Sequence, residues 1–173
     1  MPLQSHILPP PILRKVSSKI SELLRKDVLH QPAEDHRLYT PGFCLPIQIM
    51  PKQGTLKLGR PEGVRVFIQH GDSVLAAVDF MYHGRQLKLT TIHQGGGLDS
   101  MLVMLNKLEK RYKRYPGACR PELIYFLLGR SPYIKVTAGR EIRFFHQPKE
   151  KLIAVTAEQL LRNISAIIKH RQS

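Results

Sequence analysis

The stretch VRVFIQHGDSVLAAVDFMYHGRQLKLTTIHQGGGLDSMLVMLNKLEKRYKRY, residues 64–115, decides the fold. Three runs rich in β-branched, aliphatic and aromatic residues lie at 64–68, 74–82 and 87–92, and the sequences HGDS and HGRQ separate them. Short β-type runs with glycine-containing turns between them are typical of hairpins. The stretch therefore predicts an antiparallel meander of three strands.

A glycine-rich junction follows the meander. Its residues are Gln94, Gly95, Gly96, Gly97, Leu98, Asp99 and Ser100. Glycines let a backbone approach a ligand closely, and the N–H groups of a helix's first turn present positive partial charge to it. The junction is therefore predicted to bind a phosphate group. Asp99 and Ser100 are also good N-cap residues, so a capped helix without a ligand is the alternative.

Apolar residues recur at helical spacing after the junction. They are Leu98, Met101, Leu102, Leu105, Leu108 and Tyr112. Basic residues gather on the other side, and Pro116-Gly117 ends the pattern. This periodicity predicts an amphipathic helix directly after the glycines.

The N-terminal part is expected to hold one helix and an irregular arm. Pro11 suits a first helical position, and apolar residues at helical spacing continue to about residue 27. Residues 31–60 contain four prolines and three glycines without sustained periodicity, which predicts a winding connection with at most a short strand near 45–50.

The C-terminal part is expected to add strands and a last helix. A continuous apolar run at 123–128 predicts a buried strand, and residues 133–136 with 141–145 predict a hairpin. Thr156 followed by Gln159 is typical of a capping box at a helix start. We therefore predict an α/β (α+β) fold: a mixed sheet with a β-meander, a glycine loop and flanking helices. The arm would occupy residues 1–60 and the core 61–173, within one globular domain.

Composition points to an anionic partner. The 173 residues include 27 Lys and Arg against 13 Asp and Glu, which gives a formal net charge of +14. Such a surface attracts nucleic acid, acidic protein, anionic lipid or a phosphate-rich cofactor. The densest basic run is Lys107–Arg114.

Cysteine usage and hydropathy bear on the compartment. Cys44 and Cys119 are the only cysteines, so no disulfide framework or Cys-rich zinc pattern exists. The scattered histidines show no metal-ligand spacing, and we expect no metal. No apolar run has the length of a membrane-spanning helix. We predict a cytoplasmic, reducing environment, and export by an uncleaved signal stays open.

The order of meander, glycine loop, helix and buried strand resembles the GNAT superfamily of acyl-CoA-dependent N-acyltransferases over about residues 64–130. In that family a loop of pattern Gln/Arg-x-x-Gly-x-Gly/Ala binds the pyrophosphate of acyl-CoA. Gln94 and Gly97 match this pattern, whereas Asp99 stands where a small residue is usual. The family also has a helix after the buried strand, for which residues 129–133 leave little room.

The resemblance implies a cofactor, a substrate and roles for particular residues. The cofactor would be acetyl-CoA or another acyl-CoA, and the acceptor would be an amine of a protein or small molecule. Asp79 or His93 would be the base, and Tyr133 the acid that protonates the leaving thiolate. The cofactor-binding residues would be Gln94, Gly95, Gly96, Gly97, Leu98, Ser100 and Lys107, with Lys110 or Arg111 as alternatives for the outer phosphate.

Two non-enzymatic functions compete with this hypothesis. The first is a basic nucleic-acid-binding module that uses 107–114 and strand-borne cations, with aromatic rings for stacking. Its candidates are Arg65, Lys88, Arg140 and Arg143, with Tyr82, Tyr112 and Phe144. The second is a secreted, effector-type protein that docks on an acidic partner or a membrane surface.

Overall fold

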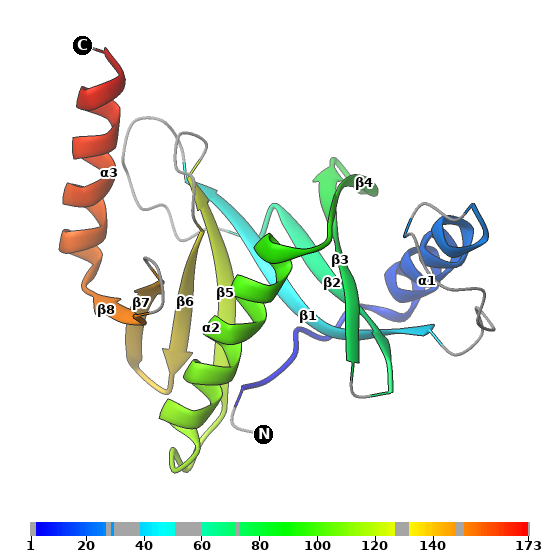
Figure 1. Cartoon of the computed structure of the whole chain (residues 1–173), viewed down its shortest axis with the longest axis horizontal. Coiled ribbons are helices and arrows are strands. Elements are labelled where there is room, and N and C mark those ends of the chain that lie inside the picture. Colours follow the sequence, from blue (N-terminus) through cyan, green and yellow to red (C-terminus); the bar gives the residue numbers. More distant parts are fainter. Residues whose placement is uncertain are drawn as a thin grey trace. The chain divides into compact units, whose positions relative to one another are not determined.

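The described residues of the computed structural model form eleven helices and strands (Figure 1). The structure describes residues 3–26, 29, 39–50, 60–71, 73–126, 132–147 and 151–172. In chain order the elements are α1 (Pro10–Arg25), β1 (Tyr39–Met50), β2 (Gly63–His70), β3 (Ser73–His83), β4 (Gln86–His93), α2 (Gly96–Tyr112), β5 (Cys119–Phe126), β6 (Tyr133–Ala138), β7 (Glu141–His146), β8 (Ile153–Val155) and α3 (Ala157–Gln172).

The strands form one mixed sheet in the order β4-β3-β2-β1-β5-β6-β7-β8. The pair β1–β5 is parallel, whereas β2–β3, β3–β4 and β5 to β8 pair antiparallel. The predicted α/β class, with its meander and glycine loop, is therefore confirmed. No described strand covers the outer side of β4, so β4 is the edge of the described sheet.

The chain divides into two compact units. One contains residues 1–5, 45–62 and 102–173, and the other contains 6–44 and 63–101. Each unit draws residues from both sides of position 60, where the sequence suggested an arm followed by a core. The unit of residues 6–44 and 63–101 holds the meander and the start of α2.

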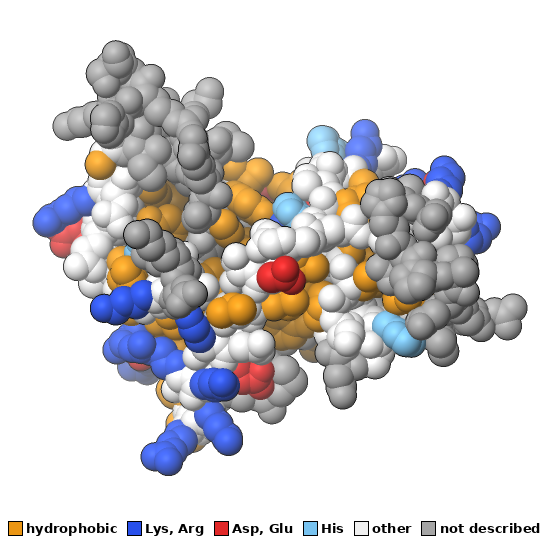
Figure 2. Space-filling view, in the orientation of Figure 1, with side chains coloured by type: hydrophobic (Ala, Val, Ile, Leu, Met, Phe, Trp, Pro, Cys, Tyr) orange, Lys and Arg blue, Asp and Glu red, His pale blue; other side chains and the backbone are white. Residues whose placement is uncertain are grey.

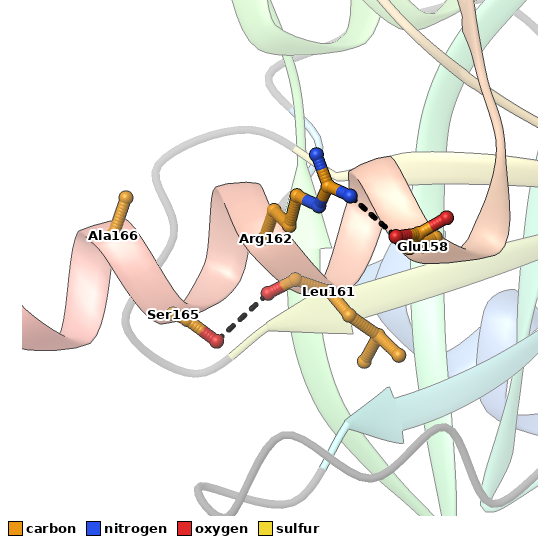
Figure 3. A pocket seen from close by; sticks show the side chains of 5 residues that line it. All are labelled: Glu158, Leu161, Arg162, Ser165 and Ala166. Atoms are coloured by element: carbon orange, nitrogen blue, oxygen red, sulfur yellow. Dashed lines mark hydrogen bonds and ion pairs between the residues drawn. The ribbon is translucent and has the colours of Figure 1, made fainter.

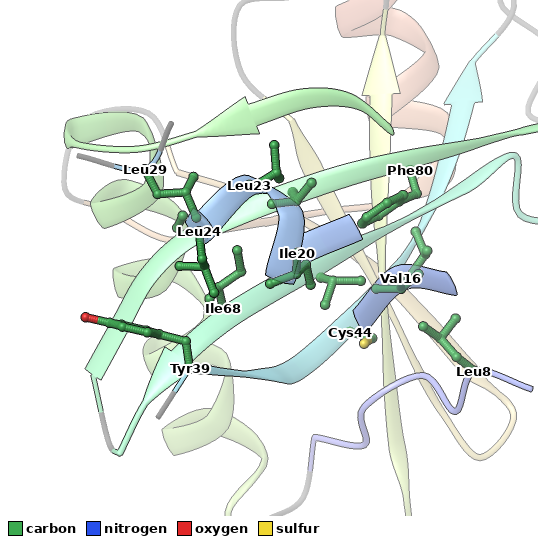
Figure 4. Close-up of a cluster of buried hydrophobic side chains, with 14 residues drawn as sticks. Leu8, Val16, Ile20, Leu23, Leu24, Leu29, Tyr39, Cys44, Ile68 and Phe80 are labelled. Carbon is green, nitrogen blue, oxygen red and sulfur yellow. The ribbon is translucent and has the colours of Figure 1, made fainter. Parts of the chain in front are cut away.

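The apolar face of α1 packs on the meander (Figure 4). Pro10 occupies the first turn, where its missing N–H is no loss, and Val16, Ile20 and Leu24 are buried. Val66 and Val78 belong to the same cluster and lie opposite each other on β2 and β3. The predicted helix from 11 to 27 is thus present with slightly earlier bounds.

Strand β1 corrects the expectation of a winding connection. Residues 39–50 form a strand of 12 residues that contains Pro41 and Pro46, where the sequence indicated at most a short strand at 45–50. The remainder of that connection, at 31–38 and 51–59, lies outside the described residues. Prolines are unusual inside a sheet because they donate no ladder hydrogen bond, which is why the pattern argued against a strand here.

A β-bulge in β4 sets which side chains share a face. Phe80 pairs with Leu89 and Asp79 pairs with Thr91, so Thr90 is the extra residue. Its hydroxyl donates to the carbonyl of Asp79 at 3.1 Å. Because side chains alternate along a strand, this extra residue moves His93 to the face opposite Leu89. His93 thereby shares a face with Asp79.

The other unit packs α3 against β6 to β8. Leu160 and Ile164 of α3 are fully buried beside Phe144. The predicted capping box is present: the Thr156 N–H donates to Gln159 Oε1 at 2.9 Å, and the Gln159 N–H donates to Thr156 Oγ1 at 3.2 Å. The predicted hairpin is β6–β7, and the short strand β8 before the helix was not predicted.

Candidate active site

A buried cluster of charged and polar side chains lies on the meander. Arg65 Nε donates to Asp79 Oδ1 at 2.7 Å, and Arg65 Nη2 donates to Asp79 Oδ2 at 2.9 Å. His93 Nε2 lies 2.8 Å from Asp79 Oδ2 and 2.6 Å from Arg65 Nη2. Arg65 Nη1 also contacts Met101 Sδ of α2 at 3.1 Å. The structure thus joins two sequence-predicted site residues, Asp79 and His93.

The three groups differ in their access to solvent. The side chains of Arg65 and Asp79 are 4% and 7% exposed, whereas that of His93 is 28% exposed. Nε2 of a neutral imidazole either accepts from Arg65 or donates to Asp79. When it donates to the carboxylate, Nδ1 is left as the basic nitrogen. This is the arrangement in which a carboxylate orients a histidine base.

Asp79 is held in its ionised form. Burial raises the pKa of this carboxyl group, but hydrogen bonds from Arg65 and His93 outweigh that effect, so the net pKa lies below its ordinary value. A carboxylate with a lowered pKa and both oxygens bonded is a poor proton acceptor. Of the two predicted bases, His93 is therefore the one whose geometry suits the role.

The glycine-rich junction follows His93 directly, and Gly95 is its first glycine. Gly95 has a φ of 67°, and its carbonyl accepts from the N–H groups of Leu98 and Asp99 at 2.9 and 3.1 Å. Helix α2 begins at Gly96, so Asp99 lies inside the first turn and the predicted N-cap at Asp99 or Ser100 is wrong. Ser100 Oγ instead donates backwards to the Gly96 carbonyl at 2.9 Å.

Amides at the start of α2 stay open in the predicted phosphate cradle. The N–H groups of Gly96 and Gly97 meet no acceptor in the described part of the chain, and both residues are exposed. A Cβ atom at either position would meet nothing within 4 Å. The open end of α2 therefore has space for an anion beside it.

Two other predicted cofactor-binding residues, Gln94 and Leu98, make contacts within the fold. Gln94 Nε2 donates to the Leu29 carbonyl at 2.8 Å, and Leu98 is a core residue 4% exposed. Lys107 lies ten residues beyond Gly97 on α2, in the unit of 102–173. Its role toward an outer phosphate stays a prediction.

Tyr133, the predicted acid, belongs to the unit of 102–173. Its side chain is buried, and its ring stacks on His146 with 5.0 Å between ring centroids. Burial lowers the pKa of His146. The helix that the resemblance implies after the buried strand is not seen among the described residues, where β5 ends at Phe126 and β6 begins at Tyr133. Residues 127–131 lie outside the described part.

Two polar features were missed from the sequence. Arg65 was considered only as a surface cation, yet it is a lone charge in an apolar strand, as is Asp79. Such complementary lone charges on neighbouring strands are a signal for pairing. The second feature is a buried group in the other unit: Gln48 donates to Glu122 at 2.8 Å, and Lys135 pairs with Glu122 at 2.6 Å.

A shallow hollow lies along α3 (Figure 3). Its volume is about 510 Å3, and its polar side chains already bond within the helix. Arg162 pairs with Glu158, and Ser165 Oγ donates to the Leu161 carbonyl at 2.9 Å. This hollow therefore offers a ligand few unsatisfied groups.

Basic side chains gather over the C-terminal half of α2 and the β6–β7 hairpin (Figure 2). Lys110, Lys113 and Arg114 are exposed and meet no carboxylate among the described residues. Arg111 lies over the Phe145 ring, 5.4 Å from its centroid. Three other members of the nucleic-acid hypothesis are unavailable at the surface: Arg65, Tyr112 and Phe144 are buried.

The described residues hold no cluster of three or more His, Cys, Asp or Glu side chains suited to a metal ion. Within the same residues, no helix is both long and apolar enough to cross a membrane. Cys44 and Cys119 are buried free thiols, and burial raises the pKa of Cys119. Comparison with protein families, curated proteins and solved structures finds no match to this chain.

Proposed function

We propose that the chain transfers an acyl group from an acyl-CoA, such as acetyl-CoA, to an amine. The observation that carries this proposal is the hydrogen bond between Asp79 and His93, three residues before the open amides of α2. Three residues of extended chain span at most about 11 Å. A candidate base and a candidate phosphate site therefore lie next to each other.

His93 is the proposed general base, and Asp79 is its positioning residue. The amine nitrogen attacks the thioester carbonyl carbon, a C–N bond forms, and the C–S bond breaks. His93 accepts the proton that the amine loses, and the coenzyme leaves as a thiolate that takes a proton from solvent. Histidine is the side chain most often used for such proton transfer. Tyr133 is buried in the other unit, so this scheme does not rely on it.

The edge position of β4 supports the same proposal. Its outer backbone groups face no described strand. The pantetheine arm of CoA contains two amides, which can pair with such an edge in the manner of an added strand. The pyrophosphate would then lie at Gly96 and Gly97, and the thioester would lie further back along β4, toward the bulge at Thr90.

The test is thermal unfolding with acetyl-CoA. A ligand at one hundred times its Kd stabilises the folded state by about 2.7 kcal/mol, which for a domain of this size raises Tm by roughly 5–10 °C. Gly97→Phe is expected to keep the Tm without ligand, because its Cβ meets open space, and to lose the shift. Asn106→Phe, at an exposed position later on α2, is the matched control and should keep the shift.

His93→Gln separates binding from chemistry. It should bind acetyl-CoA as the parent does and lose thiol release in the presence of an amine acceptor such as polylysine. No Tm shift with saturating acetyl-CoA, or an equal shift in Gly97→Phe and Asn106→Phe, would overturn the proposal.

A second candidate function, binding to a polyanion such as nucleic acid, is favoured by a different observation. Lys110, Lys113 and Arg114 present three exposed charges that form no ion pair within the described residues. Such charges bind phosphates with little dependence on sequence.

A further inference from the structure

A second pocket, of about 510 Å3, lies between α1 and β4. Its volume falls within the range of small-molecule sites. Three of its lining residues are lysines, Lys15 and Lys19 from α1 and Lys88 from β4. All of its lining residues belong to the unit of 6–44 and 63–101. The pocket is distinct from the candidate active site, because Phe80 lines it and the adjacent Asp79 points to the other face of the sheet.

The floor of this pocket is apolar. Val16 and Phe80 are 1% and 2% exposed and lie at the same end of the cluster drawn in Figure 4. Leu87 and Leu89 on β4 are only partly buried and extend the apolar surface toward the edge of the sheet. Leu87 and Leu89 thus offer an aliphatic chain an apolar surface that the protein does not fully cover, above the buried Val16 and Phe80.

The lysines at the rim differ in how far they are neutralised. Lys19 Nζ pairs with Glu22 at 2.6 Å, and Glu22 also pairs with Lys26 at 2.7 Å. Lys15 and Lys88 meet no carboxylate in the described part of the chain. Lys15 and Lys88 therefore leave positive charge beside an apolar floor, with one lysine on each of the two elements that form the pocket.

We propose that this pocket binds a fatty acid, with its aliphatic chain on Leu87 and Leu89 and its carboxylate between Lys15 and Lys88. An ammonium donates charge-assisted hydrogen bonds to a carboxylate, and the apolar floor removes the chain from water. A neutral chain would leave the lysines without a partner, and a small anion would leave the floor exposed. The site is independent of the proposed acyl transfer.

The experiment measures decanoate binding by isothermal titration calorimetry, below its micelle concentration and with the full chain. We expect one saturable site, and a Kd about tenfold weaker in the K15A/K88A variant, because two exposed ion pairs are lost. Leu89→Gln should weaken binding as well. The K110A/K113A variant removes the same charge elsewhere and should bind as the parent does.

Three further measurements decide between occupants. Decan-1-ol, with the same chain and no charge, should bind more weakly than decanoate, and decyltrimethylammonium should not bind. Equal Kd values for K15A/K88A and K110A/K113A, or for decan-1-ol and decanoate, would refute a carboxylate site. Binding to phosphatidylglycerol vesicles without binding to monomeric decanoate would replace the fatty acid by a membrane surface.

Discussion

Arg65 and Asp79 show how a single pair of charges is accommodated inside a sheet. Each is the only Asp, Glu, Lys or Arg of its strand, and they face each other directly in the β2–β3 register. The two hydrogen bonds between them satisfy the carboxylate, and His93 occupies its remaining side. Removing one partner would leave the other buried and charged.

We therefore predict that Asp79→Asn lowers the free energy of unfolding by about 3–5 kcal/mol, because it leaves the buried Arg65 without its counter-ion. The double variant R65M/D79L should lose less of the free energy of unfolding than D79N alone, since neither buried charge remains. Urea unfolding at pH 7 measures both. A D79N variant as stable as the parent would contradict the account.

The same pair predicts a dependence on acid. The folded-state pKa of Asp79 is below the unfolded value of about 3.9. The ionised carboxylate therefore adds to the free energy of unfolding above about pH 3.9, and this addition is lost as the pH falls through the folded-state pKa. The gap in stability between the parent and D79N should narrow on acidification. Glu22→Gln is the control: hydrogen bonds from Lys19 and Lys26 lower the pKa of Glu22 to about 2, but this carboxylate lies on the exposed surface.

At the scale of elements, the start of α3 rests on a reciprocal pair of hydrogen bonds. Thr156→Ala should lower the free energy of unfolding by about 1 kcal/mol, because it leaves the Gln159 N–H without its acceptor. Urea unfolding checks the value. Ser165→Ala, which removes a hydroxyl bonded within the same helix, should have a smaller effect. Equal losses in both variants would argue against the capping box.

The elements show which parts of the fold can be predicted from sequence. The meander was predicted because its turn residues are local signals, and Gly84 indeed has a φ of 62° between β3 and β4. β1 was missed because its two prolines argue locally against a strand, whereas its pairing with β5 is a contact distant in sequence. Local patterns report on turns and periodicity, and β1 depends on its neighbours in the sheet.

The candidate site could be predicted only in part, because local patterns do not report contacts between strands. Asp79 and His93 were chosen by residue type, but their contact depends on the bulge at Thr90, which strict alternation does not reveal. The helix start was placed too late because Asp99 is a favourable cap in isolation. Gly95 provides the turn instead, through a positive φ and a carbonyl that begins the helix.

At the scale of the whole molecule, the net charge of +14 predicts binding that weakens with salt. Affinity for a single-stranded oligonucleotide, measured by fluorescence anisotropy, should fall linearly in a plot of log K against log salt. The K110A/K113A/R114A variant should reduce the slope by about 2, since each phosphate contact on a single strand contributes roughly 0.7.

The R14A/K15A/R85A variant provides the matched control, because it removes three exposed charges from the other unit, none of them a candidate nucleic-acid contact. Its slope should stay close to that of the parent. An equal reduction in both triple variants would mean that total charge, and not the basic surface of Lys110, Lys113 and Arg114, determines the binding.

The bulge in β4 also bears on how this chain can change in length. A deletion within a regular strand turns every later side chain to the opposite face. Removing Thr90 would instead convert the bulge into regular pairing and leave Leu89 and His93 on the faces they already occupy. β4 can therefore lose this residue in evolution while Leu89 stays on the core face and His93 stays on the face of the candidate site.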